Sequence, residues 1–398
     1  MLIGIVGKPS TGKSTFFMAA TSVAVPRSPR PFTTIKPNHA VGYVEVECVD
    51  KEFGVKCNPR HGYCINSRRF VPVELLDVAG LVPGAHEGKG LGNRFLDDLR
   101  QADALIHIVD ASGSTNEMGE SVGVGNYDPL NDIRFLEDEV DYWICGIVDK
   151  SWDKMCRLQA SANRKSSELL CEQLSGLGVR LWHIENVLKK IGIAEEKLSE
   201  WNKEDVFGFC REIRKTSKPI LIAANKCDVR IAEKNIERMR KEFPDYVIVP
   251  VSAESELALK EAAKKGYIEY IPGDSEFRVI NELDDKQRAA LEFIRHNVIE
   301  KYGSTGVQKC LNHAVFELLK YVAVFPGGVN RLADSEGNIL PDVFLMPPGS
   351  TALDFAARIH KDMAKNFIRA IDVRTKRAVG ADYILKNRDV IEIVFGKK

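Results

Sequence analysis

The sequence predicts an α/β fold with a mixed, mostly parallel sheet, a helical insertion and a small C-terminal domain with its own sheet. Short apolar runs at residues 2–6, 104–109 and 219–224 each end in a polar or glycine-rich turn, which is typical of buried parallel strands. Helical signals fill residues 129–217, between the second and third runs. From residue 321 β-rich runs return, which predicts a separate α+β domain.

Three parts follow from this pattern. We expect residues 1–128 and 218–320 to form the N-terminal α/β domain, residues 129–217 the helical insertion, and residues 321–398 the C-terminal domain. A chain of 398 residues is long enough for two or three domains. With 44% hydrophobic and 28% charged residues, its composition is that of a globular protein.

The charge of the chain gives no general signature for a nucleic-acid or membrane partner, because 56 basic residues balance 56 acidic ones. No apolar run is long enough to span a bilayer. The first motif begins at residue 7, which leaves no room for a cleaved signal peptide. We therefore expect a cytoplasmic monomer with no membrane partner.

The first apolar run leads into residues 7–14, Gly-Lys-Pro-Ser-Thr-Gly-Lys-Ser, which have the spacing of a phosphate-binding P-loop. In such a loop backbone N–H groups surround an anion, and the next helix points its positive end at that anion. Gly7 and Gly12 allow the close backbone approach. Lys13 would contact the outer phosphates and Ser14 would ligate Mg²⁺. The predicted phosphate-binding residues are Gly7, Lys8, Pro9, Ser10, Thr11, Gly12, Lys13, Ser14 and Thr15.

Two further segments would complete the phosphate and metal site. A proline-rich loop contains Thr34, which we expect to supply a second Mg²⁺ ligand. A β-rich run ends in Asp-Val-Ala-Gly at 77–80, where Asp77 would hold Mg²⁺ through water and the N–H of Gly80 would reach the terminal phosphate. The glycine-rich loop at 83–92 suits a segment that ligand binding orders.

The third apolar run ends in Asn225-Lys226-Cys227-Asp228, an N-K-x-D motif. Asp228 would accept hydrogen bonds from N1–H and N2–H₂ of guanine, a pattern that adenine lacks. Asn225 would bond the base edge and the P-loop, and the stem of Lys226 would lie over the ring. The backbone of Ser252, Ala253 and Glu254 would close over guanine O6.

The helical insertion is expected because Asp77 and Asn225 are 148 positions apart, more than a helix, a strand and a helix would fill. We expect three to five helices there. Four basic residues would share one face of one helix: Lys150, Lys154, Arg157 and Arg164. That face would suit RNA phosphates, although an ordinary solvated face is the more common meaning of such spacing.

Nine cysteines are scattered singly except for Cys57 and Cys64, which flank a short segment containing His61. We favour an ordinary hairpin tip here, with a disulfide or a metal site as the alternatives. A metal site needs about four ligands, so it requires Cys48 to fold back onto this segment.

The C-terminal domain is predicted as a mixed sheet with one helix, for which Ser350 would be the N-cap. An apolar stripe would mark the buried helix face: Leu353, Ala356, Ile359, Met363 and Phe367. Arg358, Lys361 and Lys365 would share a basic face, and 12 basic against 9 acidic residues from position 322 give a net charge of +3. These charges favour an anionic partner weakly, against a solvated face.

Together these motifs resemble the Obg superfamily of translation-factor-class GTPases. The most specific segments are residues 32–38 (FTTIKPN), 77–85 (DVAGLVPGA) and 88–96 (GKGLGNRFL), the last being typical of the YchF and DRG branches. Residues 347–352 (PPGSTA) and 379–385 (VGADYIL) resemble a TGS domain, a β-grasp module. The resemblance extends over nearly the whole chain and looks closest to archaeal YchF-related proteins.

The resemblance implies a Ras-like P-loop GTPase domain that binds GTP and GDP with Mg²⁺, hydrolyses GTP and associates with ribosomes or RNA in translation. YchF proteins that prefer ATP often replace the N-K-x-D motif, so the intact motif at 225–228 predicts GTP. Ser10 stands where K⁺-activated relatives carry Asn, which makes K⁺ dependence doubtful.

Hydrolysis is expected to be slow. Leu81 occupies the position at which Ras-like enzymes carry a water-orienting Gln, and leucine does not polarise water. A histidine that some relatives use lies in a later loop and has no counterpart here, which makes His86 the candidate. The predicted catalytic residues are Lys13, Thr34, Gly80 and His86.

The sequence thus favours a GTP-hydrolysing switch associated with ribosomes or RNA. The alternatives are a nucleotide-gated RNA- or protein-binding module with negligible hydrolysis, and an ATPase as in some YchF relatives.

Overall fold

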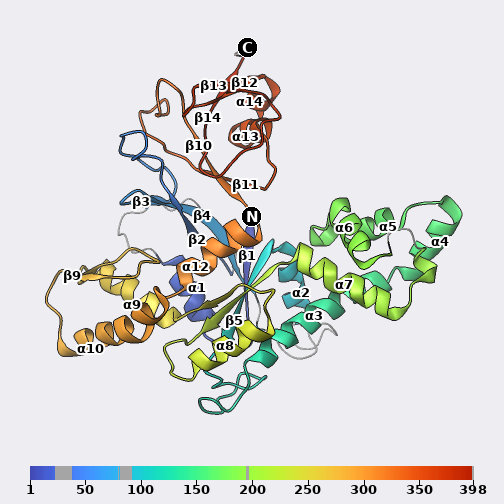
Figure 1. Cartoon of the computed structure of the whole chain (residues 1–398), viewed down its shortest axis with the longest axis horizontal. Coiled ribbons are helices and arrows are strands. Elements are labelled where there is room, and N and C mark those ends of the chain that lie inside the picture. The colour runs from blue at the N-terminus through green and yellow to red at the C-terminus, as the bar shows by residue number, and fades with distance from the viewer. Residues whose placement is uncertain (23–37, 79, 81–91, 194–196, 397–398) are drawn as a thin grey trace.

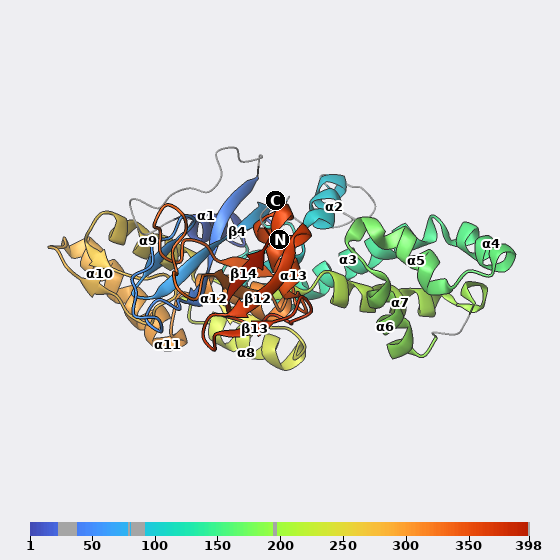
Figure 2. The same ribbon diagram turned by 90° about the horizontal axis from the view of Figure 1, so that it is seen from above.

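The computed structural model of the chain describes residues 1–22, 38–78, 80, 92–193 and 197–396. Figures 1 and 2 show the helical insertion projecting to one side of the N-terminal α/β domain, and the C-terminal domain standing on a different side of it. Thr34, Leu81 and His86 lie outside the described residues. Among the helices that are described, none is both long and apolar enough to cross a bilayer.

The sheet of the N-terminal α/β domain has seven strands in the order β2-β4-β1-β5-β6-β7, with β3 also paired to β4. Strands β4, β1, β5, β6 and β7 run parallel, whereas β2 and β3 are antiparallel to β4, so the mixed, mostly parallel sheet is confirmed. The strands are β1 (Leu2–Val6), β2 (His39–Glu47), β3 (Tyr63–Ile65), β4 (Arg68–Asp77), β5 (Ala104–Asp110), β6 (Ile220–Asn225) and β7 (Ile248–Pro250).

Both faces of this sheet are covered, which explains the nearly continuous apolar sequence of β1, β5 and β6. Alternate residues of β1 enter two different cores: Leu2 and Val6 pack into one, Ile3 and Ile5 into the other. The helices of this domain are α1 (Lys13–Thr21), α2 (Gly92–Gln101), α8 (Ala232–Glu242), α9 (Ala253–Lys264), α10 (Asp285–Ile294), α11 (Glu300–Tyr302) and α12 (Val307–Asn312). Short π-helical turns follow α10 and α12, and a small hairpin joins β8 (Ile268–Glu269) to β9 (Arg278–Val279).

The regular elements described in the helical insertion are all helices. They include α3 (Leu130–Asp149), α4 (Trp152–Ala162), α5 (Ser166–Leu174), α6 (Leu181–Ile191) and α7 (Lys203–Ser217). The buried guanidinium of Arg214 on α7 bonds Asp141 of α3 at 2.6 Å and the hydroxyl of Tyr246 at 2.8 Å. This buried network links the base of the insertion to the segment before β7.

The predicted basic face of the insertion is wrong. Lys150 ends α3, and Arg164 lies beyond the end of α4, where Asn163 adopts a left-handed conformation that stops the helix. Arg164 is also engaged with Glu172 at 2.5 Å and Glu168 at 3.7 Å. Because two helix ends interrupt the run, the spacing of the four basic residues does not place them on one helix face.

The C-terminal domain is a five-stranded mixed sheet in the order β11-β10-β14-β12-β13, with β10 and β14 parallel. Its elements are β10 (Val322–Pro326), β11 (Phe344–Met346), α13 (Ala352–Ile359), α14 (Lys361–Lys365), β12 (Phe367–Asp372), β13 (Arg377–Val379) and β14 (Val390–Phe395). This arrangement of one sheet and a short helical segment agrees with the predicted β-grasp fold.

Two details of this domain were predicted incorrectly. Thr351, not Ser350, is the N-cap of α13, because its side chain accepts a hydrogen bond from the N–H of Asp354 while Asp354 bonds back to Thr351. The helix also ends at Ile359, and His360 has an extended backbone. The predicted apolar stripe and the basic face of Arg358, Lys361 and Lys365 therefore do not lie on one helix.

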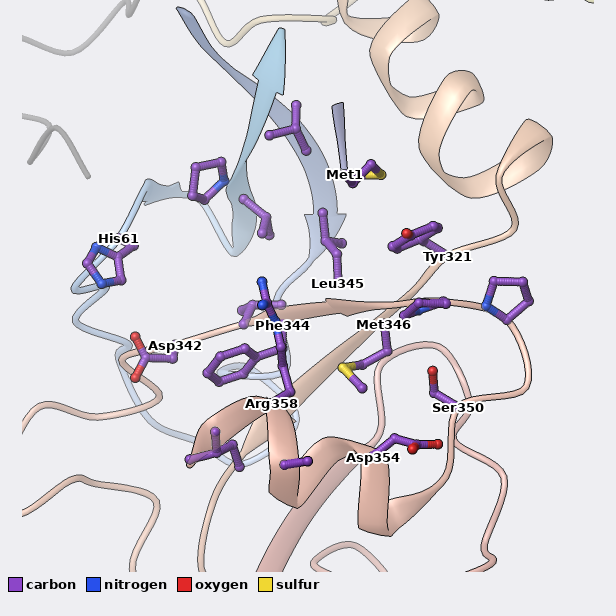
Figure 3. A pocket seen from close by; sticks show the side chains of 18 of the residues that line it. Met1, His61, Tyr321, Asp342, Phe344, Leu345, Met346, Ser350, Asp354 and Arg358 are labelled. Carbon is purple, nitrogen blue, oxygen red and sulfur yellow. The ribbon is translucent and has the colours of Figure 1, made fainter. Parts of the chain in front are cut away.

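An open cleft of about 1160 Å³ separates the C-terminal domain from the N-terminal α/β domain. Met1 and Val73 line it from the sheet, Arg180 from the helical insertion, and Met346 and Arg358 from the C-terminal domain. Figure 3 shows the labelled side chains of this cleft, with His61 and Asp342 at one end and Ser350 and Asp354 at the other.

Candidate nucleotide-binding site

The P-loop connects the carboxyl end of β1 to the start of α1, as the glycine spacing predicts. A Cβ on Gly7 would lie 2.8 Å from the carbonyl oxygen of Ile108. Gly12 has φ of +89°, and a Cβ there would lie 2.3 Å from Nδ2 of Asn225. No side chain in the described part of the chain caps the first turn of α1, so its N–H groups are available to an anion.

The side chain of Lys8 does not face a phosphate. Its Nζ is buried and lies 2.9 Å from Asp132 of α3, 2.8 Å from the carbonyl of Thr115 and 3.9 Å from the centre of the Tyr127 ring. Lys8 therefore anchors the P-loop to the base of the helical insertion, and only its backbone remains for a ligand. Burial raises the pKa of Asp132 to about 6, although the positive charge of Lys8 acts to lower it.

Four of the residues predicted to hold the metal and the terminal phosphate are described: Lys13, Ser14, Asp77 and Gly80. Asp77 is the last residue of β4, and its carboxylate forms an ion pair with Nζ of Lys13. Ser14 is exposed in the first turn of α1, and Gly80 approaches the P-loop, since a Cβ on it would lie 3.8 Å from Pro9. A hydroxyl and a carboxylate are the oxygen donors that Mg²⁺ prefers, so this pair fits a Mg²⁺ ion.

Asn225 joins three segments of the site. Its Nδ2 donates to the carbonyl of Thr11 at 2.8 Å, and its Oδ1 accepts from the N–H of Ala253 at 3.1 Å. Asn225 itself is buried, so both of these bonds are protected from water. One amide side chain thus fixes the P-loop relative to the start of α9.

Lys226 is held by Asp110, a residue that the sequence analysis did not assign to the site. Nζ of Lys226 lies 2.9 Å from Asp110, which is buried at the end of β5 and also accepts from the hydroxyls of Ser112 and Ser114. Although burial acts in the opposite direction, these hydrogen bonds and the Lys226 charge lower the pKa of Asp110. The sequence did contain a signal for this role, because Asp110 stands directly at the end of an apolar strand.

Asp228 and residues 252–254 complete the predicted base site. Asp228 is half-buried, and no hydrogen bond or ion pair joins its carboxylate to the described part of the chain. Ser252 is buried, with its hydroxyl 2.8 Å from that of Ser255, whereas Glu254 is exposed on the first turn of α9. The N–H of Ala253 bonds Oδ1 of Asn225, so the start of α9 lies next to the motif that ends in Asp228.

Comparison with known families matches three separate parts of the chain. Residues 2–133 match the family described as 50S ribosome-binding GTPase. Residues 223–328 match the G4 motif-containing domain of Obg-like GTPases of the YGR210 type, and residues 336–395 match the TGS domain.

Full-length relatives agree with these matches. The chain is 48% identical to an uncharacterized GTP-binding protein of Methanocaldococcus jannaschii over 100% of both chains. It is 39% identical to an uncharacterized GTP-binding protein of Schizosaccharomyces pombe over 88% of both chains, and 29% identical to the ribosome-binding ATPase YchF of Haemophilus influenzae over 98% of both.

A solved structure shows the same overall fold. The crystal structure of a GTP-binding protein from Pyrococcus horikoshii aligns over 100% of both chains with 39% identity and a TM-score of 0.79. The YchF GTPase of Schizosaccharomyces pombe aligns over 99% of this chain and 97% of its own with 20% identity and a TM-score of 0.60, which supports the fold alone.

Proposed function

The chain belongs to the YchF family of Obg-like GTPases, and from this premise we propose that it is a GTP-hydrolysing switch that acts on ribosomes or RNA. The observation that carries the proposal is the bridge made by Asn225. Through this residue the P-loop, the N-K-x-D motif and the start of α9 form one connected site for a guanine nucleotide.

Guanine preference would rest on Asp228. An ionised carboxylate only accepts hydrogen bonds, and guanine offers two adjacent donors at N1 and N2, whereas adenine offers an acceptor at N1. The ion pair of Lys226 with Asp110 holds the lysine stem beside this position, so the carboxylate stays unpaired for the base. ATP would leave Asp228 without a partner.

Hydrolysis would use few groups of the chain. Lys13 and the N–H groups at the start of α1 would neutralise the phosphates, with Ser14 and Asp77 holding Mg²⁺, which supplies charge stabilisation when bound. The present ion pair of Lys13 with Asp77 would exchange for contacts to phosphate and metal. Thr34 as a metal ligand and His86 as the group that assists water remain proposals.

A ribosomal site of action is supported by the relatives. Four bacterial relatives are named ribosome-binding ATPases, and residues 2–133 match a family named for binding the 50S subunit. Because these relatives are named ATPases, ATP is the competing candidate substrate. The second candidate function is therefore a ribosome-bound ATPase, which the unpaired Asp228 disfavours.

The test measures fluorescent GTP and ATP affinities, followed by single-turnover hydrolysis with and without ribosomes from the same organism. We expect tighter GTP binding, and an Asp228→Asn variant should lose at least about 100-fold in GTP affinity while gaining affinity for xanthosine triphosphate. Equal GTP and ATP affinities in the unmodified protein contradict the guanine assignment. Hydrolysis that ribosomes leave unchanged contradicts the switch and favours a nucleotide-gated binding module.

A further inference from the structure

Three cysteines and one aspartate meet at the amino end of β4, the end opposite the P-loop. The ligand atoms of Cys48, Asp50, Cys57 and Cys64 all lie within 4.8 Å of one another. Cys48 and Asp50 are buried, and Cys57 and Cys64 are half-buried. No other group of three or more histidine, cysteine or acidic side chains gathers in this way in the described ranges.

The sheet itself brings these residues together. Cys48 follows β2, and its N–H bonds the carbonyl of Ser67, while Cys64 on β3 is opposite Arg69 of β4. The N–H of Val55 bonds the carbonyl of Asp50 at 3.0 Å, which folds the intervening loop back. The hairpin turn lies between β3 and β4, so the expectation that Cys57 and Cys64 flank a simple hairpin tip is wrong.

The spacing of the sulfur atoms fits a metal better than a disulfide. Sγ of Cys48 lies 3.8 Å from Sγ of Cys57. Two thiolates bound tetrahedrally to Zn²⁺ at about 2.3 Å are about 3.8 Å apart, whereas a disulfide needs about 2.0 Å. Three sulfurs and one carboxylate also supply the four ligands of a closed structural site, and thiolates favour zinc over magnesium or calcium.

A buried positive charge next to the cluster supports the same assignment. The guanidinium of Arg69 is 1% exposed, and it donates to the carbonyls of Leu340 and Pro341, while its Nε has no hydrogen-bond partner among the described residues. No carboxylate of the described residues forms an ion pair with it. A zinc site with three thiolates and a carboxylate is net negative and would balance this arginine.

We propose that Cys48, Asp50, Cys57 and Cys64 bind a structural Zn²⁺ ion that braces the loop between β2 and β3 against the C-terminal domain. This loop carries direct backbone contacts to the segment before β11. The N–H of Asn58 bonds the carbonyl of Ile339 at 2.8 Å, and the N–H of Arg60 bonds that of Pro341 at 2.9 Å. His61 lines the interdomain cleft and is not a ligand (Figure 3).

The test is a zinc measurement on the full-length protein, purified in reducing buffer, supplied with ZnCl₂ and then desalted. We expect about one zinc per chain, and CoCl₂ in its place should give intense thiolate-to-cobalt absorption with the visible bands of a tetrahedral site. Cys57→Ser should lose most of the bound zinc, while the matched control Cys156→Ser, which changes a half-buried cysteine of α4, should keep it. Asp50→Cys should retain zinc, and Asp50→Ala should bind it at least about tenfold more weakly in competition with a chromophoric chelator.

Three results would overturn the proposal: zinc below about 0.1 per chain in the unmodified protein, unchanged zinc in Cys57→Ser, or a disulfide between cluster cysteines after anaerobic purification. Should Cys57→Ser not fold, the cobalt spectrum of the unmodified protein and zinc retention by Asp50→Cys decide the question. Circular dichroism and GTP affinity establish that each variant is folded.

Discussion

The two ends of β4 are built in different ways. At the carboxyl end Asp77 belongs to a nucleotide site whose parts are short motifs, each placed by its own strand. At the amino end Arg69 lies beside a cysteine cluster whose loop, residues 48–62, contains no strand or helix and contacts the segment around 334–342. The first end is therefore assembled from motifs that can each be recognised in the sequence, whereas the loop at the second end has no such motif and contacts a segment of the C-terminal part of the chain.

The difference teaches where each end obtains its stability. In the nucleotide site buried side chains such as Asn225 and Lys8 tie the loops to the core directly. Near the cysteine cluster, the irregular loop is held by backbone hydrogen bonds and side-chain contacts. The proposed zinc ion would supply most of the remaining constraint on the conformation of this loop. The two ends should therefore respond to different perturbations.

Metal removal should give the largest effect. Treating the zinc-loaded protein with a strong chelator should lower its free energy of unfolding by at least about 3 kcal/mol, because the metal binds only the folded loop. Protease cleavage within residues 50–62 should accelerate, while GTP affinity stays unchanged. Chemical denaturation before and after chelation measures the change, with the Cys57→Ser variant as the insensitive control; a loss of GTP affinity in parallel would show that the ends are not independent.

Asn225→Ala should give the next largest effect, at the other end. It leaves the carbonyl of Thr11 and the N–H of Ala253 without their partner, which costs about 2–3 kcal/mol and lowers GTP affinity about 30- to 150-fold. Asn235→Ala is the matched control, since this buried asparagine bonds the carbonyl of Ala111 away from the P-loop. Equal affinity losses in both variants would mean that the bridge has no special role. Titration with fluorescent GTP measures both.

Acid should destabilise the nucleotide end through His107. Burial, followed by the charge of Lys8, lowers its pKa to about 3, whereas the unfolded chain titrates near 6.5. Below pH 6.5 the unfolded chain binds a proton at His107 that the folded protein does not bind, so the free energy of unfolding decreases as the pH falls. The expected decrease is about 2 kcal/mol between pH 7.5 and 5. Asp132, with its raised pKa, acts in the opposite direction. The measurement is therefore the difference in unfolding free energy between the unmodified protein and His107→Gln; a pH-independent difference contradicts the prediction.

The smallest effect is expected from a surface ion pair between the domains. Arg374 of the C-terminal domain contacts both carboxylate oxygens of Glu52, at 2.6 and 2.9 Å. Because both side chains are partly exposed, Arg374→Ala should cost less than about 1 kcal/mol, and high salt should remove the difference. A larger loss of stability in thermal denaturation would mean that this ion pair, rather than the cysteine cluster, holds the loop against the C-terminal domain.

Sequence alone predicted that the P-loop and the N-K-x-D motif belong to one end of the sheet. The structure brings these two motifs together, since Asn225 bonds the carbonyl of Thr11 and a Cβ on Gly12 would lie 2.3 Å from Nδ2 of Asn225. The contact of the Lys8 side chain with Asp132 was not predicted, because Asp132 lies 124 positions away in the sequence. Contacts across such separations leave no periodic signal in a single sequence.

The other end could not be predicted for the same reason. Whether Cys48 folds back onto Cys57 and Cys64 depends on β2 and β3 both pairing with β4, which is a matter of topology. Helix ends were also missed: Asn163 and His360 interrupt runs that read as continuous helices, and the basic faces predicted there disappear with them.

Strand β4 also limits how the two ends communicate. It is hydrogen-bonded to β2 along one side, and to β3 and β1 at different points along the other. A slip by one residue would turn buried Leu75 outward and exposed Glu74 inward, so the strand does not slide. The strand is therefore a rigid element about 30 Å long. We expect any movement of the C-terminal domain relative to the nucleotide site to occur at the ends of β4.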